Sequence, residues 1–398
     1  MHFTVRADMD AAIEAILPET VLLRRALHQH PEIRFQERWT SDRIAAELSR
    51  SGITVKRGYC GGTGLVGETG GNPERVIALR ADMDGLEIQE ETGVDYASEI
   101  PKRMHACGHD GHMAMLCGAA RILAQRAAAL DCTVRFIFQP GEELGMGGRV
   151  MVEEGVLNGV EAVFCLHGWP SIALGRVGLK SGVAMAAADW FQIAIRGKGC
   201  HGADPSSGVN PIVVAAQVVT GLQTLGDAAS ELGGPTVISV GRIHGGEAKN
   251  IIPETTVIAG SLRTLSSETR DKARAAIQNI AADIADRFGA AAVTVFDEKA
   301  YMPLYNDPAM CDRARRAINA DIAEQIVLDM DAPSMASEDF AYYLERVPGA
   351  ILWLGTGRAD GDTPPLHSPR YDFNDDALAT GIGVWLRLVQ GFSRRWNV

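Results

Sequence analysis

The sequence predicts an α/β protein in which a domain with a mostly parallel central sheet is interrupted by an inserted, smaller ferredoxin-like α+β domain. The chain has 398 residues, which at roughly 150 residues per domain suggests two domains or three. In its first and last parts, predicted strands alternate with predicted helices, as in parallel β-α-β units. Between them the predicted order is β-α-β-β-α-β, which is typical of a ferredoxin-like unit. The predicted boundaries assign residues 1–183 and 296–398 to the larger domain and 184–295 to the insert.

The first part of the chain begins with helical periodicity and continues with buried strands. Two helices come first, and Gly52 follows the second one at the position where a glycine commonly ends a helix. Short β-type runs, a long apolar helix and two strongly apolar strands follow. The predicted ranges are 10–30 and 39–51 for the first helices, 53–55, 64–68 and 76–79 for strands, 112–129 for the apolar helix, 133–138 for a strand, 147–157 for a helix and 162–166 for a strand.

The pattern changes near residue 183, where a long β-type run begins. The helix that follows this run has Pro211 in its first turn, a position that proline favours. The insert is predicted as strand 186–196, helix 210–225, strands 235–243 and 255–263, helix 266–288 and strand 292–295. After it, the chain returns to α/β character with a helix at 307–321, a segment at 337–344, a strand at 350–354 and a closing helix at 374–393.

Composition and charge exclude several classes of protein. The chain is 46% hydrophobic and 22% charged, as ordinary globular proteins are. No apolar stretch approaches the ~20 residues that cross a bilayer, and a net charge of −12 disfavours a nucleic-acid partner, which would need a basic face. The seven cysteines form no CxxC pair and no secretory pattern precedes them, so we expect reduced thiols and a cytoplasmic location.

A glycine-rich segment, Gly62–Gly67, matches the G-x-G-x-x-G pattern of dinucleotide sites. Such a site needs a helix to open at the loop, so that the helix N-terminus meets the pyrophosphate. Here Gly70, Gly71 and Pro73 follow, and they disfavour a helix. We therefore expect a β-hairpin and no nucleotide.

A dense cluster of metal-ligand residue types, HACGHDGH, occupies residues 105–112. Cys107 and His109 are two residues apart, so an extended chain would aim both to one side. Gly108 and Gly111 let the backbone bend around a site. These residue types suit a metal ion. Two alternatives remain open, namely a cysteine nucleophile activated by an imidazole and a loop with incidental polar residues.

Carboxylates follow two of the predicted strands. Glu142 and Glu143 come just after the apolar strand at 133–138. At a metal site, one of them would ligate and the other would take a proton from the attacking water; elsewhere, such a pair is an ordinary solvated surface feature. Asp84 follows the strand at 76–79, and a carboxylate there could orient a metal-bound imidazole, or simply belong to a turn.

Further candidates are single polar residues, each with a purely structural alternative. His167 and His367 are candidate metal ligands only if the fold brings them next to the His/Cys cluster. In the insert, His201 lies in a glycine-rich bend after a strand and could donate a hydrogen bond to a developing oxyanion. Asn250 is a polar group at a predicted strand end, and Arg263 could bind a substrate carboxylate through two hydrogen bonds.

Taken together, these motifs resemble a known family over nearly the whole chain. The segments are, in chain order, HPEIRFQE (30–37), RADMDGL (80–86), HACGHDGH (105–112), FQPGEE (138–143), HGWP (167–170), GKGCHGADP (197–205), AKNIIPE (248–254), SEDF (337–340) and LHSP (366–369). The chain resembles the aminoacylase/carboxypeptidase-type metallohydrolases. Within them it is most similar to the branch of hippurate hydrolases, N-acyl-amino-acid amidohydrolases, N-acetyldiaminopimelate deacetylases and indole-acetyl-amino-acid hydrolases.

The resemblance implies that the larger domain is catalytic and that the insert is a lid and dimerisation domain. It implies two divalent metal ions, with Mn²⁺ favoured over Zn²⁺, Co²⁺ or Ni²⁺. Glu142 would be the general base, Asp84 would orient a ligand, and His201 would reach the active site of a partner subunit in a homodimer or homotetramer. The implied metal ligands are Cys107, His109, Glu143, His167 and His367.

The expected function is metal-dependent hydrolysis of the amide bond of N-acyl amino acids. Deacylation of N-acetyl-diaminopimelate or of indole-acetyl amino acids are alternatives for the same site. The Asp82-Met-Asp84 segment in place of the wider family's His-x-Asp, and Cys107 in place of a bridging Asp, favour the amidohydrolase branch over dipeptidases. From other classes, a cysteine-nucleophile amidase using Cys107 would survive chelation, and a non-enzymatic metal-binding protein would not need the spare carboxylate of Glu142.

Overall fold

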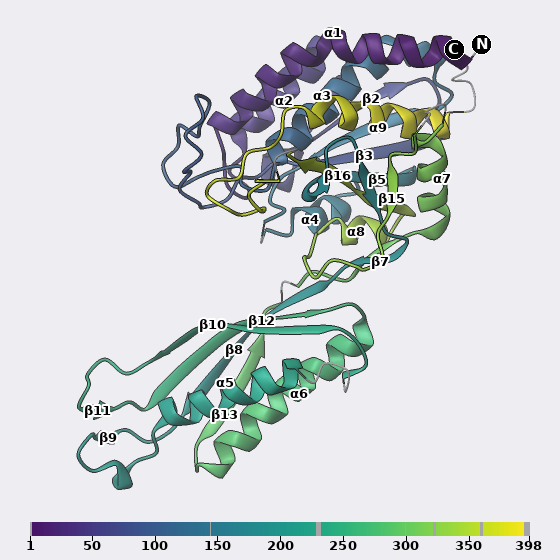
Figure 1. Cartoon of the computed structure of the whole chain (residues 1–398). Coiled ribbons are helices and arrows are strands. Elements are labelled where there is room, and N and C mark those ends of the chain that lie inside the picture. Colours follow the sequence, from purple (N-terminus) through teal and green to yellow (C-terminus); the bar gives the residue numbers. More distant parts are fainter. Residues whose placement is uncertain are drawn as a thin grey trace. The chain divides into compact units, whose positions relative to one another are not determined.

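The computed structural model describes residues 2–143, 145–227, 232–298, 300–320, 324–358 and 361–393 (Figure 1). The chain forms two compact units. The larger unit comprises Met1–Gly182, Tyr305–Ala332 and Asp339–Val398, and the inserted unit comprises Val183–Leu304 and Pro333–Glu338. Among the described helices, none combines the length and the apolar character needed to cross a membrane.

An eight-stranded sheet forms the centre of the larger unit, with the strand order β1-β2-β4-β3-β5-β16-β6-β15. The central strands β4, β3, β5 and β16 run parallel to one another. Three pairs are antiparallel: β1 with β2, β2 with β4, and β6 with β16. The predicted α/β class is therefore confirmed. The strands are β1 Thr54–Tyr59, β2 Gly64–Gly70, β3 Val76–Asp82, β4 Thr133–Gln139, β5 Val160–Ala173, β6 Val177–Leu179, β15 Val327–Asp329 and β16 Gly349–Gly357.

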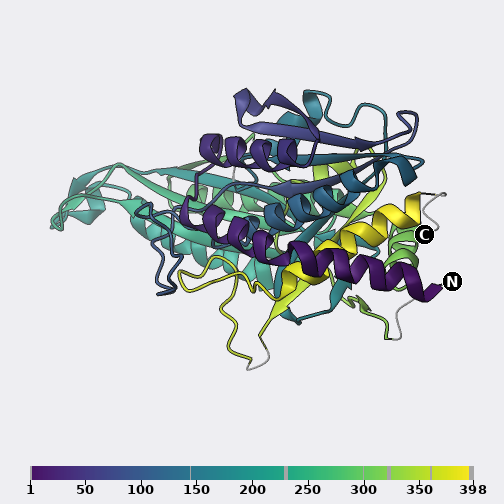
Figure 2. The same ribbon diagram turned by 90° about the horizontal axis from the view of Figure 1, so that it is seen from above.

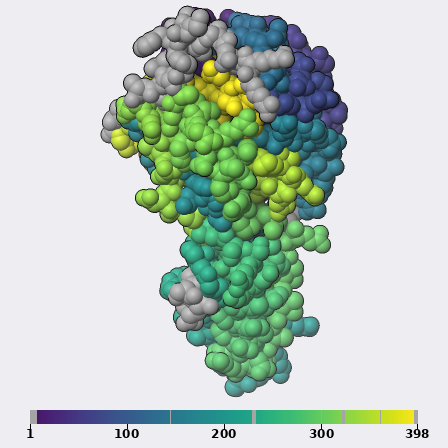
Figure 3. All heavy atoms as spheres, turned by 90° about the vertical axis from the view of Figure 1, so that its right-hand side faces the viewer, coloured from purple at the N-terminus to yellow at the C-terminus, as the bar shows by residue number. Residues whose placement is uncertain are grey.

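Helices cover this sheet, and the apolar helix α3 is buried along most of its length. Helices α1 and α9 pack against α3 and against each other, side by side in Figure 2. On the face shown in Figure 3, α7 lies beside α9, and the two helices pack together. The helices are α1 His2–Gln29, α2 Arg38–Arg50, α3 His109–Gln125, α4 Gly147–Glu153, α7 Pro308–Ile318, α8 Ala341–Leu344 and α9 Ala377–Phe392.

The inserted unit has the predicted β-α-β-β-α-β order. Its antiparallel sheet has the strand order β10-β12-β8-β13, and the apolar residues of α5 and α6 share one core with the alternate, buried residues of the strands. The elements are β8 Ala187–Arg196, β9 Cys200–His201, α5 Pro211–Asp227, β10 Thr236–Gly245, β11 Ile251–Ile252, β12 Thr255–Thr264, α6 Ser267–Arg287 and β13 Ala291–Phe296. The short strands β7 Gly182–Met185 and β14 Leu304–Asn306 lie where the chain passes from one unit to the other.

The inserted unit extends beyond the range 184–295 expected from the sequence. Ala188 and Tyr301 exchange backbone hydrogen bonds, and the N–H of Ala186 donates to the carbonyl of Ser334. These pairings attach two later segments to the first strands of the unit. They join residues that are far apart in the sequence, so no local pattern indicates them.

The glycine-rich segment at Gly62–Gly67 forms part of the predicted hairpin. Strand β2 pairs antiparallel with β1, and Gly61 and Gly62 take the positive φ angles of the turn between them, 70° and 113°. The chain continues as a strand after this turn, so no helix N-terminus lies at the glycines.

Candidate metal centre

The candidate metal-ligand and acid–base side chains of the larger unit lie at the carboxyl ends of its parallel strands. Strand β3 ends at Asp82, β4 ends shortly before Glu142, and helix α3 begins at His109. Because the carboxyl ends of neighbouring parallel strands lie at one edge of a sheet, these groups meet there. His167 was expected to follow a strand that ends at residue 166, but it lies inside β5, because pairing with β16 continues as far as Ala173.

The five side chains predicted as metal ligands lie next to one another. Ligand atoms of Cys107, His109 and Glu143 are within 4.8 Å of each other. The Nε2 of His167 lies 3.5 Å from the Sγ of Cys107, and the Nε2 of His367 lies 3.0 Å from the Oε1 of Glu143. Cys107 is therefore close to His167 as well as to His109 and Glu143, and these side chains together would hold metal ions.

The state of His109 shows that this set fits a metal. Both of its ring nitrogens are buried, and neither has a hydrogen-bond partner in the described part of the chain. The Nδ1 lies 3.5 Å from Asp84 and the Nε2 lies 3.8 Å from Asp82. A buried polar atom without a partner is costly, and a metal ion on one of these nitrogens would remove that cost while the other nitrogen carries its proton toward the nearby carboxylate. Imidazole, thiolate and carboxylate ligands together suit first-row divalent ions.

The electrostatics of Cys107 oppose a thiolate that has no cation beside it. Burial, together with the carboxylates of Glu143 and Glu142, raises the pKa of its thiol well above the usual range. A cysteine nucleophile and a metal ligand both need a thiolate, and a bound metal ion would supply the positive charge that deprotonates it. Burial holds the pKa of His167 well below its usual value, and its Nδ1–H donates to the carbonyl of Gly168 at 2.8 Å, so the Nε2 of this neutral imidazole has a lone pair for a metal ion.

His112 has no separate role in the sequence analysis, and the structure places it between two strands. The N–H of Gly168 donates to its Nε2 at 2.7 Å. Its Nδ1 therefore carries the proton and donates to Asp82, at 2.6 Å. With both nitrogens engaged, His112 links β3 to β5 instead of binding a metal ion. Its position three residues after His109 on a helix is the only signal for it in the sequence.

Asp84 holds the acidic pair through the backbone. Its two oxygens accept hydrogen bonds from the N–H groups of Glu142 and Glu143, each at 2.9 Å. It was predicted to orient a ligand imidazole, and its Oδ1 lies 3.5 Å from the Nδ1 of His109. Glu142 is buried, with 6% of the residue exposed, and its carboxylate accepts a hydrogen bond from the N–H of Asp339 at 3.4 Å. Glu142 is thus outside the Cys107 group of ligand atoms and belongs to a second group, with Glu338 and Asp339, although its charge still acts on the thiol of Cys107.

The remaining predicted residues belong to the inserted unit. His201 is exposed, and its Nδ1 accepts a hydrogen bond from the N–H of Ala203 at 3.0 Å. Its Nε2 therefore carries the proton, as a hydrogen-bond donor requires. Asn250 is adjacent, because its carbonyl accepts from Gly202. Arg263 lies near the opposite end of β12 from these two.

The guanidinium of Arg263 is already engaged within the inserted unit. It donates to the hydroxyl of Ser337 at 2.9 Å and to the carbonyl of Met335 at 3.3 Å. The structure therefore brings His201 and Asn250 together and leaves Arg263 apart from them. The roles of these three residues in binding substrate stay predictions.

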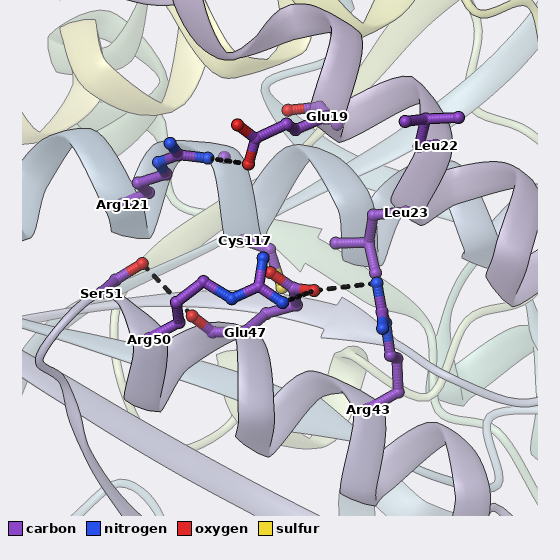
Figure 4. Close-up of a pocket in the computed structure, with 11 residues that line it drawn as sticks. Glu19, Leu22, Leu23, Arg43, Glu47, Arg50, Ser51, Cys117 and Arg121 are labelled. Atoms are coloured by element: carbon purple, nitrogen blue, oxygen red, sulfur yellow. Dashed lines mark hydrogen bonds and ion pairs between the residues drawn. The ribbon is translucent and has the colours of Figure 1, made fainter.

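A separate pocket of about 150 Å³ lies among helices α1, α2 and α3 (Figure 4). Its charged side chains pair with one another: Arg121 binds Glu19 at 2.6 Å, and Arg43 and Arg50 both bind Glu47. Because its charges are paired internally, we assign this pocket no ligand.

Comparisons with known proteins agree with this geometry. The sequence profile of Peptidase family M20/M25/M40 matches residues 78–391. An N-acetylcysteine deacetylase of Bacillus subtilis (strain 168) is 38% identical over 380 residues, which cover 95% of this chain and 98% of that protein. An IAA-amino acid hydrolase of Arabidopsis thaliana is 34% identical, covering 91% and 83%. Among solved structures, the Bacillus subtilis YXEP protein, described as a dinuclear metal binding peptidase from the M20 family, has a TM-score of 0.80 at 35% identity and covers 94% and 98%.

Proposed function

Because the chain belongs to Peptidase family M20/M25/M40 and is an amidohydrolase, we propose that its substrates are N-acyl amino acids, from which it releases the free amino acid. The observation that carries this proposal is the carboxylate of Glu142, which lies outside the predicted ligand set but close enough for its charge to act on the thiol of Cys107. A purely structural metal site has no use for such a group. The names of the relatives, which include N-acetylcysteine deacetylases and an IAA-amino acid hydrolase, support the substrate class and leave several acyl groups open.

The two divalent ions would be held by Cys107, His109, Glu143, His167 and His367. When bound, they would polarise the amide carbonyl and lower the pKa of a water molecule. Mn²⁺ is our first choice, with Zn²⁺, Co²⁺ and Ni²⁺ as alternatives, since a mixed set of ligands accepts several of these ions.

The protein's own groups would move the protons and bind the substrate. Glu142 would take a proton from the attacking water and pass it to the leaving amine. The Nε2–H of His201 would donate to the oxyanion that develops on the carbonyl carbon. Asn250 and Arg263 would bind the polar groups of the amino-acid part.

A screen of N-acyl amino acids tests this proposal. The metal-loaded protein is given N-acetylcysteine, hippurate, an indole-acetyl amino acid and N-acetyl-diaminopimelate, and the released amine is measured with each candidate metal. We expect release that disappears on exhaustive chelation and returns with Mn²⁺, Co²⁺ or Zn²⁺. Activity that survives chelation but is lost on thiol alkylation would instead support the cysteine amidase.

We also propose that the protein is a homodimer or homotetramer assembled through the inserted unit. Strand β10 lies at the edge of the inserted sheet and exposes Val237 (40%) and Ile243 (51%). An edge strand with exposed apolar side chains is prone to pair with another chain. Light scattering of the purified protein tests this, and a monomer at micromolar concentration would contradict it. No nucleic-acid or membrane partner is proposed, and the cytoplasmic location stays a prediction.

A further inference from the structure

Three successive backbone N–H groups in the loop of the acidic pair each donate to a carboxylate. The N–H of Gly141 donates to the Oε1 of Glu37 at 2.9 Å. The N–H groups of Glu142 and Glu143 donate to the two oxygens of Asp84. The path of the backbone through this loop thus depends on two carboxyl groups from different elements.

Glu37 belongs to a short segment, Pro31–Glu37, that connects α1 to α2 and passes the ends of two strands. The N–H of Gly85, next to Asp84 at the end of β3, donates to the carbonyl of Glu32 at 2.8 Å. The backbone therefore attaches this segment to the end of β3, while the side chain of Glu37 attaches it to the loop after β4.

The side chain of Phe35 adds a second contact to the same loop. Its ring lies against Gly141, where an added Cβ would come within 3.0 Å of the ring. Phe35 has a φ of 62°, which is uncommon for a non-glycine residue and is kept only where the surroundings impose it. The segment is therefore shaped to fit the loop.

The carboxyl of Glu37 is buried at a cost in folding free energy. The residue is 0% exposed, and its Oε2 has no hydrogen-bond partner within the described residues. Burial and the neighbouring Asp84 raise the pKa of Glu37 to about 8. An apolar side chain would fill this space at a lower cost, so packing alone does not explain a carboxyl here.

We propose that Glu37 is a positioning residue that, through the N–H of Gly141, fixes the backbone from which Glu142 reaches the attacking water. The inference rests on the proposed function and adds a residue outside the range 78–391 that the family profile matches. Without Glu37, the N–H of Gly141 loses its acceptor, whereas Asp84 still accepts from the N–H groups of Glu142 and Glu143 and the carbonyl of Gly141 still accepts from Gly147. Loss of Glu37 should therefore affect proton transfer much more than metal binding.

Two substitutions of Glu37 and one control test the proposal in the full-length, Mn²⁺-loaded protein. Glu37→Ala removes the acceptor, and Glu37→Gln keeps an oxygen at the same reach. Glu32→Ala is the matched control, since that carboxylate lies on the same segment but accepts from the N–H groups of Trp39 and Thr40 at the start of α2. If Glu37→Ala does not fold, Glu37→Asp, which shortens the side chain by one methylene, replaces it.

We expect Glu37→Ala to lower kcat about ten- to hundredfold, as small misplacements of catalytic groups do, with KM and bound metal unchanged. Glu37→Gln should restore kcat to within about threefold of the wild type, because a neutral amide resembles the protonated acid. Glu32→Ala should lower the melting temperature and leave kcat unchanged. Hydrogen–deuterium exchange at Gly141 should accelerate only in Glu37→Ala, whether or not a substrate is turned over.

Several results would overturn the inference: unchanged exchange at Gly141 in Glu37→Ala, a loss of bound metal in that variant, or equal losses of kcat in the Gln and Ala variants. An equal loss in Glu32→Ala would reduce Glu37 to a general structural role. A wild type that binds metal but cleaves no N-acyl amino acid would contradict the proposed function alone, because the exchange measurement still decides the role of Glu37.

Discussion

The two units hold their polar groups in opposite ways. In the larger unit, Asp82 and His109 are 0% exposed and Asp84 is 1% exposed, and hydrogen bonds or close carboxylates surround each of them. In the inserted unit, His201 and Asn250 are exposed, and the imidazole of His201 accepts a single backbone hydrogen bond from Ala203. Buried groups are oriented before the substrate arrives, because the folded structure holds them in place. Exposed groups stay solvated until a ligand or another chain covers them. We propose that the larger unit supplies the metal ligands and the general base, and that the polar groups of the inserted unit act only when a ligand or another chain covers them.

Removal of the metal ions should have the largest effect and should be confined to the larger unit. We expect chelation to abolish amine release and to accelerate hydrogen exchange around His109 and His167, because the ions stabilise the folded state that binds them. Exchange in the inserted unit should not change. Faster exchange in both units alike would break the contrast drawn between them.

The next largest effect is expected for Glu142→Gln. Removing the general base should lower kcat by about 10²- to 10⁴-fold, while two ions stay bound and the melting temperature stays the same. Glu143→Gln is the matched comparison, since it should weaken metal binding as well. Near-normal turnover by Glu142→Gln would refute the assignment of the base.

His201→Ala should cost less, because it removes one donor to the oxyanion. We expect kcat to fall about 10²- to 10³-fold, with no change in bound metal or in melting temperature, since the side chain is exposed. His244→Ala, at another exposed histidine of the same unit whose side chain is 72% exposed, should leave kcat unchanged. A loss of bound metal in His201→Ala would contradict the prediction that His201 is not a metal ligand.

The smallest expected effect is on the stability of the fold, and it comes from a buried cluster at the start of α3. His28 lies 2.8 Å from Asp110 and 3.2 Å from Glu90. Burial opposes its protonation, but Asp110 and Glu90 prevail and raise its pKa from 6.5 to about 9. A raised pKa means that the charged imidazole stabilises the fold fully below pH 6.5, and that this stabilisation, at most about 3 kcal/mol, is lost as the pH rises through 9.

Urea unfolding of the wild type and of His28→Gln at several pH values measures this contribution. The difference in unfolding free energy between them should be largest near pH 6 and should shrink towards pH 9. A difference that grows with pH would contradict the assigned charge of His28.

The fold was predictable where the local pattern is strong. Strand β4, with its run of β-branched and aromatic residues, and the long helices lie close to the predicted ranges. The three-residue strands β6 and β15 were not predicted, because so short a strand depends on its neighbours in the sheet. His167 was placed after a strand for the same reason: only pairing with β16 shows that β5 continues to Ala173.

The sequence predicted which side chains gather at the candidate site, Asp84 included, but not every group that holds them in place; their role as metal ligands stays a prediction. Cys, His and Glu are recognised by type and spacing, and the five predicted ligands do lie together. Glu37 and His112 act through backbone N–H groups of Gly141 and Gly168. A contact between a side chain and a distant peptide leaves no pattern in the sequence, so the groups that hold the site in place become visible only in three dimensions.

Anomalous diffraction from crystals of the Mn²⁺-loaded protein tests the central claim most directly. We expect two manganese peaks in each chain, with the sulfur of Cys107, the nitrogens of His109, His167 and His367 and an oxygen of Glu143 each bound directly to one ion or the other. A single peak, or ions bound away from these five side chains, would contradict it.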